Sequence, residues 1–314
     1  MNPDMQNSIE PAWLDEVRRA AAGVRRRVLR YTIDNNGGYL SQACSAADLL
    51  CTLYVRSMRL GPSIAPPVPP SFAGPPGADN PHAFTGAGYN GPRGPELDRF
   101  FFSPVHYALV LYSVLIQVGR LASDGLAHFN VDGSTVELIG AEHSPGHELT
   151  AGSLGQCISQ AGGIALARKL RGEPGRCFVF MSDGEFQEGQ TWEAMAALAQ
   201  HRIDRIVVVV DANAQQCDGA MAGVGHIEPL AARLQAFGVR VVELDGHDPL
   251  ALAAAAALPP DGRPTVIIAR TDPCRGLPIL QARAPKLHYV RFGSQAERDS
   301  YAVVLACLEA GGQA

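Results

Sequence analysis

The sequence has no apolar run that approaches the roughly 20 residues needed to cross a bilayer. Residues 1–11 are polar and lack the basic and then apolar pattern of a secretory signal. We therefore expect a protein that works in the cytoplasm and has no membrane partner.

Paired cysteines are also missing. The seven cysteines are scattered, odd in number and never spaced as Cys-x-x-Cys, a pattern that favours neither a disulfide framework nor a zinc site. Most lie in apolar surroundings, where a thiol usually acts as a small buried hydrophobic group. This cysteine usage predicts a reducing compartment, in agreement with the cytoplasm.

An excess of positive charge is lacking too. Lys and Arg number 26 against 31 Asp and Glu, so the formal net charge is −5. This balance gives no electrostatic reason to expect nucleic acid as a partner. Hydrophobic residues make up 46% and charged residues 18% of the chain, which argues against disorder. The 314 residues allow one large α/β domain or two small ones.

Short apolar segments alternate with segments of helical periodicity along much of the chain. The expected strands are 177–181, 206–210, 239–244 and 265–269. The expected helices are 11–30, 45–58 with Ser45 as its N-cap, 107–121, 152–171, 191–201 and 249–257. This alternation predicts the α/β class, with a parallel sheet covered by helices on both faces.

Residues 61–95 have no such pattern. They hold three Pro-Pro pairs and many glycines, which excludes a helix or a central strand. We expect a long irregular loop that is either mobile or packed over the entrance of a site. Because the segment before the loop is too short to fold alone, residues 1–314 are expected to form a single domain.

Polar side chains follow two of the expected strands. Asp183 comes after the strand 177–181 and Asn213 after the strand 206–210, 30 residues later. A strand, a crossover helix and the next parallel strand span about that length, so both side chains are expected at one edge of the sheet. Their oxygens suit Mg²⁺ or Ca²⁺, together with a loop carbonyl and a diphosphate. Each residue alone is equally explained as a cap or turn residue, but the paired spacing favours a metal site.

Longer strings around these residues resemble the signatures of transketolases. Asp183-Gly184 followed by Asn213 is similar to the thiamine diphosphate fingerprint, Gly-Asp-Gly and then Asn, with Ser182 in place of the first glycine. The other matching strings are residues 183–194 (DGEFQEGQTWEA), 146–156 (GHELTAGSLGQ) and Gly246-His247-Asp248. The likeness runs from about Arg25 to His288 and implies a thiamine diphosphate-binding domain.

The resemblance implies a role for each matching position. Asp183, Asn213 and the main-chain carbonyl of Gln215 would hold Mg²⁺, or Ca²⁺ as a substitute, on the diphosphate. The other cofactor-binding positions that it implies are Gly152, Leu154, Gly184, Glu185, His106 and His288. Gly152 and Leu154 would lie beside the aminopyrimidine ring, and the backbone of Gly184 beside a phosphate.

The same resemblance implies the catalytic residues. His106 matches a histidine near the thiazolium and diphosphate, and His288 one near the reacting carbon, where an imidazole can move protons near neutral pH. Glu188 would join an acidic network at a subunit interface. Either His143 or His147 would replace a further substrate histidine, because the segment before Gly152 is shortened.

The substrate-facing positions depart from the family pattern. Tyr39 stands where transketolases carry a histidine that contacts the substrate, so the donor and acceptor sugars stay open. The chain is also much shorter than a full transketolase. The resemblance therefore implies the first subunit of a split enzyme, whose partner binds the pyrimidine and supplies the activating glutamate in an α2β2 assembly.

The activity implied is transfer of a two-carbon ketol unit from a ketose to an aldose, with thiamine diphosphate as the electron sink. Two alternatives were weighed against it. One is a subunit of another thiamine diphosphate-dependent carboligase or of a 2-oxo acid decarboxylase or dehydrogenase, and the divergent segment at Tyr39 motivates it. The other is a non-catalytic subunit, which the intact pair of Asp183 and Asn213 disfavours.

Overall fold

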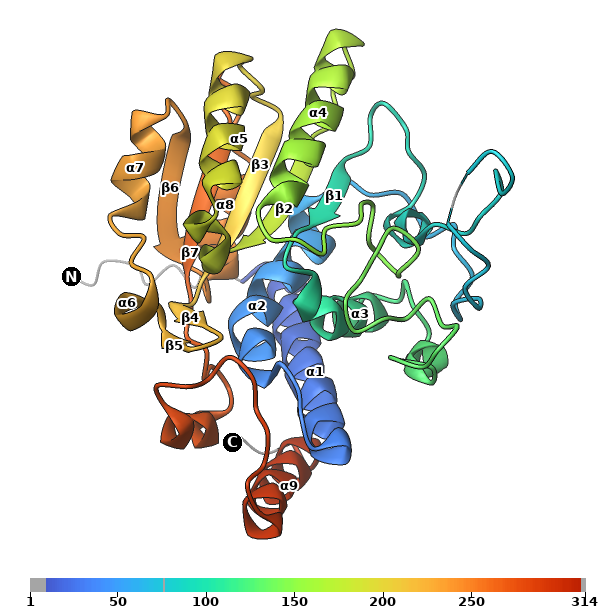
Figure 1. Ribbon diagram of the computed structural model, residues 1–314, viewed down its shortest axis with the longest axis vertical. Coiled ribbons are helices and arrows are strands. Elements are labelled where there is room, and N and C mark those ends of the chain that lie inside the picture. Colours follow the sequence, from blue (N-terminus) through green and yellow to red (C-terminus); the bar gives the residue numbers. More distant parts are fainter. Residues whose placement is uncertain (1–9, 76, 312–314) are drawn as a thin grey trace, which may run out of the picture.

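The computed structural model describes residues 10–75 and 77–311, and its centre is a five-stranded sheet (Figure 1). The strands lie in the order β1-β2-β3-β7-β6 and all neighbours are parallel. Their bounds are β1 Arg99–Phe102, β2 Cys177–Ser182, β3 Ile206–Ala212, β6 Arg240–Asp245 and β7 Thr265–Arg270. The predicted α/β class is confirmed.

Helices cover both faces of this sheet. One face is packed by α1 (Ala12–Asn35), α2 (Leu40–Thr52), α3 (Ala108–Gln117) and α8 (Pro249–Ala256). The other is packed by α4 (Gln156–Leu170), α5 (Gly189–Gln200) and α7 (Leu230–Ala236). No helix in the described part of the chain is both long and apolar enough to span a membrane.

The strands are apolar on both sides because both sides are buried. Along β3, Val207 and Val209 belong to the core under α1, α2 and α3, while Val208 and Val210 belong to the core under α4 and α5. Alternate residues of a strand point to opposite faces, so a central strand with two packed faces reads as a continuous apolar run. This is why β2, β3 and β7 could be predicted.

The predicted start of the second helix is wrong. The helix begins at Leu40, and Ser45 lies buried inside it and not at its N-terminus. The hydroxyl of Ser45 donates to the Asp211 carboxylate of β3 at 2.7 Å, which satisfies it in the helix interior. The first helix also runs further than predicted and ends at Asn36, which adopts a left-handed backbone conformation with φ 52°.

Three elements were not predicted. These are β1, α7 and α9 (Gln295–Glu309). The hydroxyl oxygen of Ser294 accepts from the backbone N–H of Glu297 and caps α9 at 3.2 Å. Helix α9 lies against α1, away from the sheet (Figure 1).

The loop 61–95 is irregular, as predicted, apart from a 3₁₀ turn at Gly86–Asn90. None of its described residues belongs to the five-stranded sheet. It packs on the segment 122–136 through main-chain hydrogen bonds, such as Phe72 N–H to Gly133 O at 2.8 Å and Ala122 N–H to Pro67 O at 2.9 Å. Its mobility stays a prediction, which hydrogen exchange can measure.

Candidate active site

A cleft of about 320 Å³ opens beyond the carboxyl ends of β2 and β3. One rim is the hairpin of β4 (Gln215–Gln216) and β5 (Gly219–Ala220), which is followed by the short helix α6 (Met221–Val224). Six of the predicted site residues line this cleft: His106, Leu154, Gly184, Glu188, Gln215 and His288. The described part of loop 61–95 contributes no lining residue, so the structure does not place it over the entrance. Parallel sheets bind ligands at this edge.

Asp183 lies directly after β2 and is buried. Its Oδ2 accepts a hydrogen bond from the backbone N–H of Ala214 at 2.7 Å, which ties the end of β2 to the end of β3. Burial, and then the nearby Asp211, raise the pKa of Asp183 to about 8. A bound cation would stabilise the charged form of this carboxylate.

Asn213 follows β3 and is held by hydrogen bonds on both sides of its amide. Its Nδ2 donates to Asp211 Oδ2 at 3.0 Å and to the Tyr107 hydroxyl at 3.2 Å. Its Oδ1 accepts from the backbone N–H of Gln215 at 2.9 Å. Because a carboxylate only accepts, Asp211 fixes which end of the amide faces it, and Oδ1 is left on the side of Gln215.

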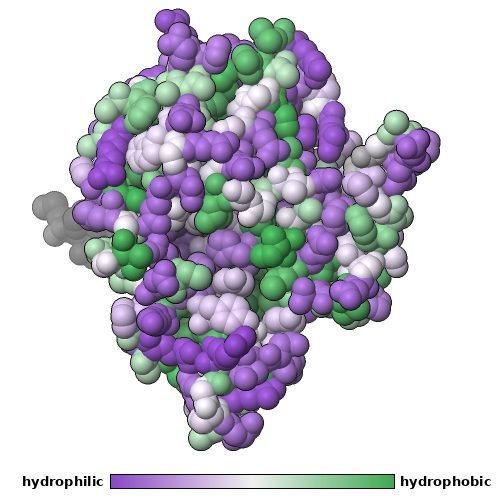
Figure 2. Space-filling view, viewed as in Figure 1, coloured by the Kyte–Doolittle hydropathy of each residue, from purple (hydrophilic) through white to green (hydrophobic). Residues whose placement is uncertain are grey.

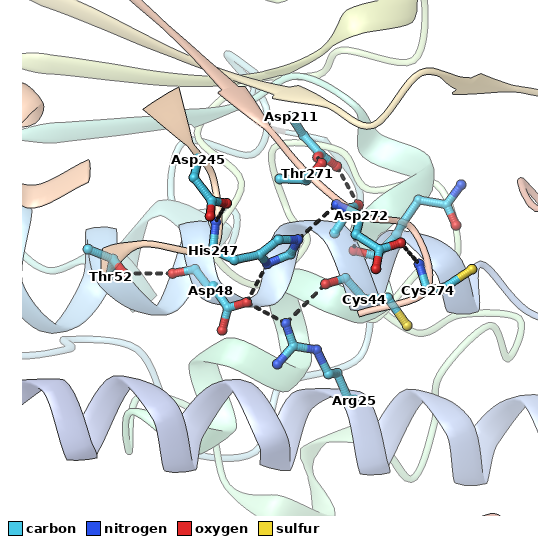
Figure 3. Close-up of polar contacts among 12 residues, drawn as sticks. Arg25, Cys44, Asp48, Thr52, Asp211, Asp245, His247, Thr271, Asp272 and Cys274 are labelled. Atoms are coloured by element: carbon cyan, nitrogen blue, oxygen red, sulfur yellow. Dashed lines mark hydrogen bonds and ion pairs between the residues drawn. The ribbon is translucent and has the colours of Figure 1, made fainter. Parts of the chain in front are cut away.

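Asp211 itself was missed by the sequence analysis. It is fully buried, and burial raises its pKa. Its Oδ1 accepts from the Thr271 hydroxyl at 2.5 Å and its Oδ2 from the Ser45 hydroxyl at 2.7 Å (Figure 3). An acidic residue inside an otherwise apolar strand, two positions before Asn213, was the signal that could have identified it.

The space beside Gly184 suits an anion. Gly184 lines the cleft, and no atom lies within 4 Å of the position that a Cβ would take there. A diphosphate oxygen can therefore approach its backbone. Within the described residues, no group of three or more His, Cys, Asp or Glu side chains is placed to hold a metal ion. The predicted set of Asp183, Asn213 and the Gln215 carbonyl contains only one such side chain, and its oxygens suit Mg²⁺.

The structure brings the two predicted catalytic histidines together. The ring centroids of His106 and His288 lie 5.3 Å apart, and Tyr39 packs on them at 5.2 and 5.6 Å. Burial, and then His288, lower the pKa of His106 to about 3, and burial lowers the pKa of His288. Burial raises the pKa of the Tyr39 phenol. All three side chains are therefore neutral near pH 7.

The alternative histidines lie elsewhere. His143 Nε2 is 2.9 Å from Glu137 Oε2, and its ring centroid is 4.4 Å from that of Phe72. His147 is fully buried, with ring contacts to Phe102 and Tyr112. Neither histidine lines the cleft, because the segment that carries them packs on the loop 61–95 and on the core.

The predicted acidic residues differ in exposure. Glu185 is fully buried and accepts from the backbone N–H groups of Ser182 at 2.8 Å and Gly155 at 3.2 Å, and from the Ser103 hydroxyl. It anchors the turn after β2 and does not line the cleft. Glu188 is exposed at the cleft edge, just before α5. Gly152 is exposed but does not line the cleft.

His247, from the matching string Gly246-His247-Asp248, has a structural role behind the cleft (Figure 3). The backbone N–H of Asp272 donates to His247 Nε2 at 2.8 Å, so Nδ1 carries the proton and donates to Asp48 at 2.7 Å. Arg25 also donates to Asp48, at 2.5 Å. Burial acts to raise the pKa of Asp48, but His247 and Arg25 outweigh it and the pKa lies below its usual value. The network joins α1 and α2 to the ends of β6 and β7.

The family profile of the transketolase thiamine diphosphate-binding domain matches residues 87–294. A transketolase family protein of Sinorhizobium fredii is 32% identical over 295 residues, which are 93% of this chain and 94% of that protein. A protein of Actinobacillus succinogenes, named as one of the subunits of an apulose-4-phosphate transketolase, is 27% identical over 90% of this chain and 94% of its own length.

Among solved structures, the transketolase of Campylobacter jejuni has the same fold, with a TM-score of 0.69 and 22% sequence identity. The match covers 96% of this chain and 48% of that one, so this chain spans about half the length of that transketolase.

Proposed function

This chain belongs to the transketolase family, and on that basis we propose that it is the diphosphate-binding subunit of a two-subunit transketolase. Its residues 1–314 form one domain in this proposal. The assembled enzyme transfers a two-carbon ketol unit from a ketose to an aldose. The observation that carries the proposal is the position of Asp183, Gly184 and Asn213 where β2 and β3 end beside the cleft. Ketol transfer by the chain mixed with its partner tests it.

The residues at the strand ends fit a metal-bound diphosphate. Asp183, Asn213 Oδ1 and the main-chain carbonyl of Gln215 hold Mg²⁺, for which Ca²⁺ is a possible substitute. The backbone at Gly184 takes the adjacent phosphate. When bound, thiamine diphosphate supplies the electron sink for the carbanion. Leu154, on the opposite wall, packs beside the aminopyrimidine, and the exposed carbonyl of Gly152 accepts from its amino group.

An apolar groove between α4 and α5 supports the proposed partner. It has a volume of about 260 Å³ and includes Ile158, Leu166, Ala194 and Leu198. Figure 2 shows hydrophobic side chains among the polar ones over these two helices. The relative from Actinobacillus succinogenes is itself named as one of several subunits. We assign this face to a pyrimidine-binding subunit that supplies the activating glutamate, near the exposed Glu188, in an α2β2 heterotetramer.

The substrates and the compartment follow from the same proposal. The substrates are small sugars, and the name of the Actinobacillus relative favours ketol transfer over 2-oxo acid decarboxylation. Five cysteines are buried free thiols: Cys44, Cys51, Cys157, Cys177 and Cys274. These buried thiols support a reducing compartment, the cytoplasm.

Replacing Asp211 with Asn is expected to weaken Mg²⁺ binding to the assembled enzyme about 10- to 100-fold, the usual effect of losing an outer-shell partner. The carboxamide has one oxygen, so it cannot accept together from Ser45, Thr271 and Asn213. Calorimetric titration of Mg²⁺ in the presence of thiamine diphosphate measures the affinity. Asp261→Asn, at an exposed ion pair far from the cleft, is the control. An unchanged Mg²⁺ affinity in Asp211→Asn would remove this positioning role.

Replacing either His106 or His288 with Ala is expected to lower kcat about 10²- to 10⁴-fold, the range for positioned groups that act on substrate protons. Both rings line the cleft, so the melting temperature should change little by comparison. Steady-state kinetics with the mixed subunits and thermal unfolding of the chain provide the two readouts. The exposed His82 gives the control, His82→Ala. Normal kinetics in both cleft variants would return these histidines to a structural role.

A further inference from the structure

His288 is held from behind by a buried side chain that the sequence did not single out. Gln42, on α2, is fully buried. Its Nε2 lies 2.9 Å from the main-chain oxygen of His288 and 3.0 Å from His288 Nδ1. Its Oε1 accepts from the Ser41 hydroxyl at 3.1 Å. One amide nitrogen therefore contacts the histidine at two points.

These contacts determine which ring nitrogen carries the proton. A main-chain carbonyl oxygen only accepts, so the group of Gln42 that faces it is the amide nitrogen. The second N–H of that nitrogen points to Nδ1 of His288, which must then be unprotonated. In a neutral imidazole the proton lies on the other nitrogen, Nε2. The ring lines the cleft, and within the described residues Nε2 has no hydrogen-bond partner.

The backbone around the pair is locked, so the contact is not a loose one. Gly38 N–H donates to Val290 O at 3.0 Å, and Val290 N–H donates to Gly38 O at 2.9 Å. A Cβ at Gly37 would come within 2.4 Å of the Tyr289 hydroxyl, so glycine is needed at this close approach. The two segments, far apart in sequence, are joined side by side immediately before α2.

The neighbours of His288 leave it neutral. The rings that face it are His106 and Tyr39, and neither carries a charge near pH 7. Protonation of His288 would place a second N–H at Nδ1, directly against the amide N–H of Gln42. The buried amide therefore opposes the imidazolium form, and the neutral ring presents a donor to the cleft.

We propose that Gln42 is a positioning residue that holds His288 as its Nε2–H tautomer, so that His288 donates a hydrogen bond to an oxygen of the sugar. This rests on the proposed function and refines it, because the sequence analysis expected proton transfer at this histidine. A neutral ring with its proton on Nε2 cannot accept another proton at that atom. Its contribution is to stabilise negative charge that develops on the substrate oxygen.

The tautomer can be read directly by two-bond ¹H–¹⁵N correlation in the full chain labelled with ¹⁵N-histidine. The His288→Gln variant assigns its signals. The wild type is expected to show the neutral Nε2–H pattern at pH 7. Gln42→Glu is expected to move the proton to Nδ1, because a carboxylate accepts where the amide donated, and Gln42→Leu to give a mixture of tautomers. A wild-type Nδ1–H pattern, or no change in either variant, would overturn the proposal.

Kinetics of the assembled enzyme separate a donor from a base. The amide of His288→Gln can still donate, whereas His288→Leu cannot, and neither can act as a base. A donor role predicts that kcat/KM of His288→Gln exceeds that of His288→Leu by about 10-fold or more, since one such hydrogen bond contributes about 10²- to 10³-fold. Equal losses in both variants would contradict it. The spectroscopic arm needs neither partner nor cofactor, so it decides the tautomer even where the mixture transfers no ketol unit.

Discussion

Purified alone, this chain is expected to transfer ketol units at less than about one-hundredth of the rate of its mixture with the partner subunit, because a missing proton-transfer group alone removes 10²- to 10⁴-fold. In this account the chain holds the metal ligands and the diphosphate wall of the cleft, while the glutamate that activates the pyrimidine lies on the partner. An assay of the chain, the partner and the equimolar mixture measures the rates. Light scattering should show a larger species only in the mixture.

The matched control for this experiment is the Asp183→Ala chain mixed with the same partner. It should assemble, because Asp183 lies at the strand edge and not in the α4–α5 groove, and it should stay inactive. Obligate interfaces often bury more than about 2,000 Å², so assembly should persist at low micromolar concentration. Robust ketol transfer by the lone chain, free of contaminating transketolase, would overturn the two-subunit account.

The second large effect is expected at the metal. Asp183→Ala in the assembled enzyme should weaken Mg²⁺-dependent binding of thiamine diphosphate by more than about 100-fold, because even outer-shell partners contribute 10- to 100-fold. The lost carboxylate is the one charged ligand that this chain offers the metal in our proposal. Asn213→Ala should act in the same direction. Calorimetry with the cofactor at fixed Mg²⁺ measures the affinity.

Stability provides the check on this variant. Burial raises the pKa of Asp183 to about 8, so the folded chain without metal holds this group protonated where the unfolded chain does not. The group therefore lowers stability progressively as pH rises from its ordinary pKa towards 8. Ala at this position removes that effect, and the variant should fold. Asp299→Ala, on the exposed face of α9, is the control. An unchanged cofactor affinity in Asp183→Ala would show that the metal lies elsewhere.

The parts of the fold that could be predicted are those in which local pattern and tertiary burial agree. β2, β3 and β7 are buried on both faces, so their apolar runs stand out from the sequence alone. β1 was missed because it is a four-residue strand that follows an irregular loop. Ser45 was misread as a cap because a serine has the same local preference whether its hydroxyl caps a helix or donates to Asp211.

The same limit applies to the site. The spacing of Asp183 and Asn213 is a property of one β-α-β unit, so it was visible in the sequence. Asp211 acts by holding Asn213, and Gln42 contacts His288 across 246 residues of sequence. Such contacts exist only in the folded chain. His143 was proposed from the resemblance alone, and the packing of its loop against Phe72 and Glu137 takes it away from the cleft.

The most direct test of the central claim is to locate the metal. Crystals of the assembled enzyme with thiamine diphosphate and Mn²⁺ in place of Mg²⁺ will show the ion by its anomalous scattering. The account predicts one peak per copy of this chain, with Asp183, Asn213 Oδ1 and the main-chain oxygen of Gln215 at about 2.1 Å. A diphosphate bound with its metal away from these three oxygens would contradict it.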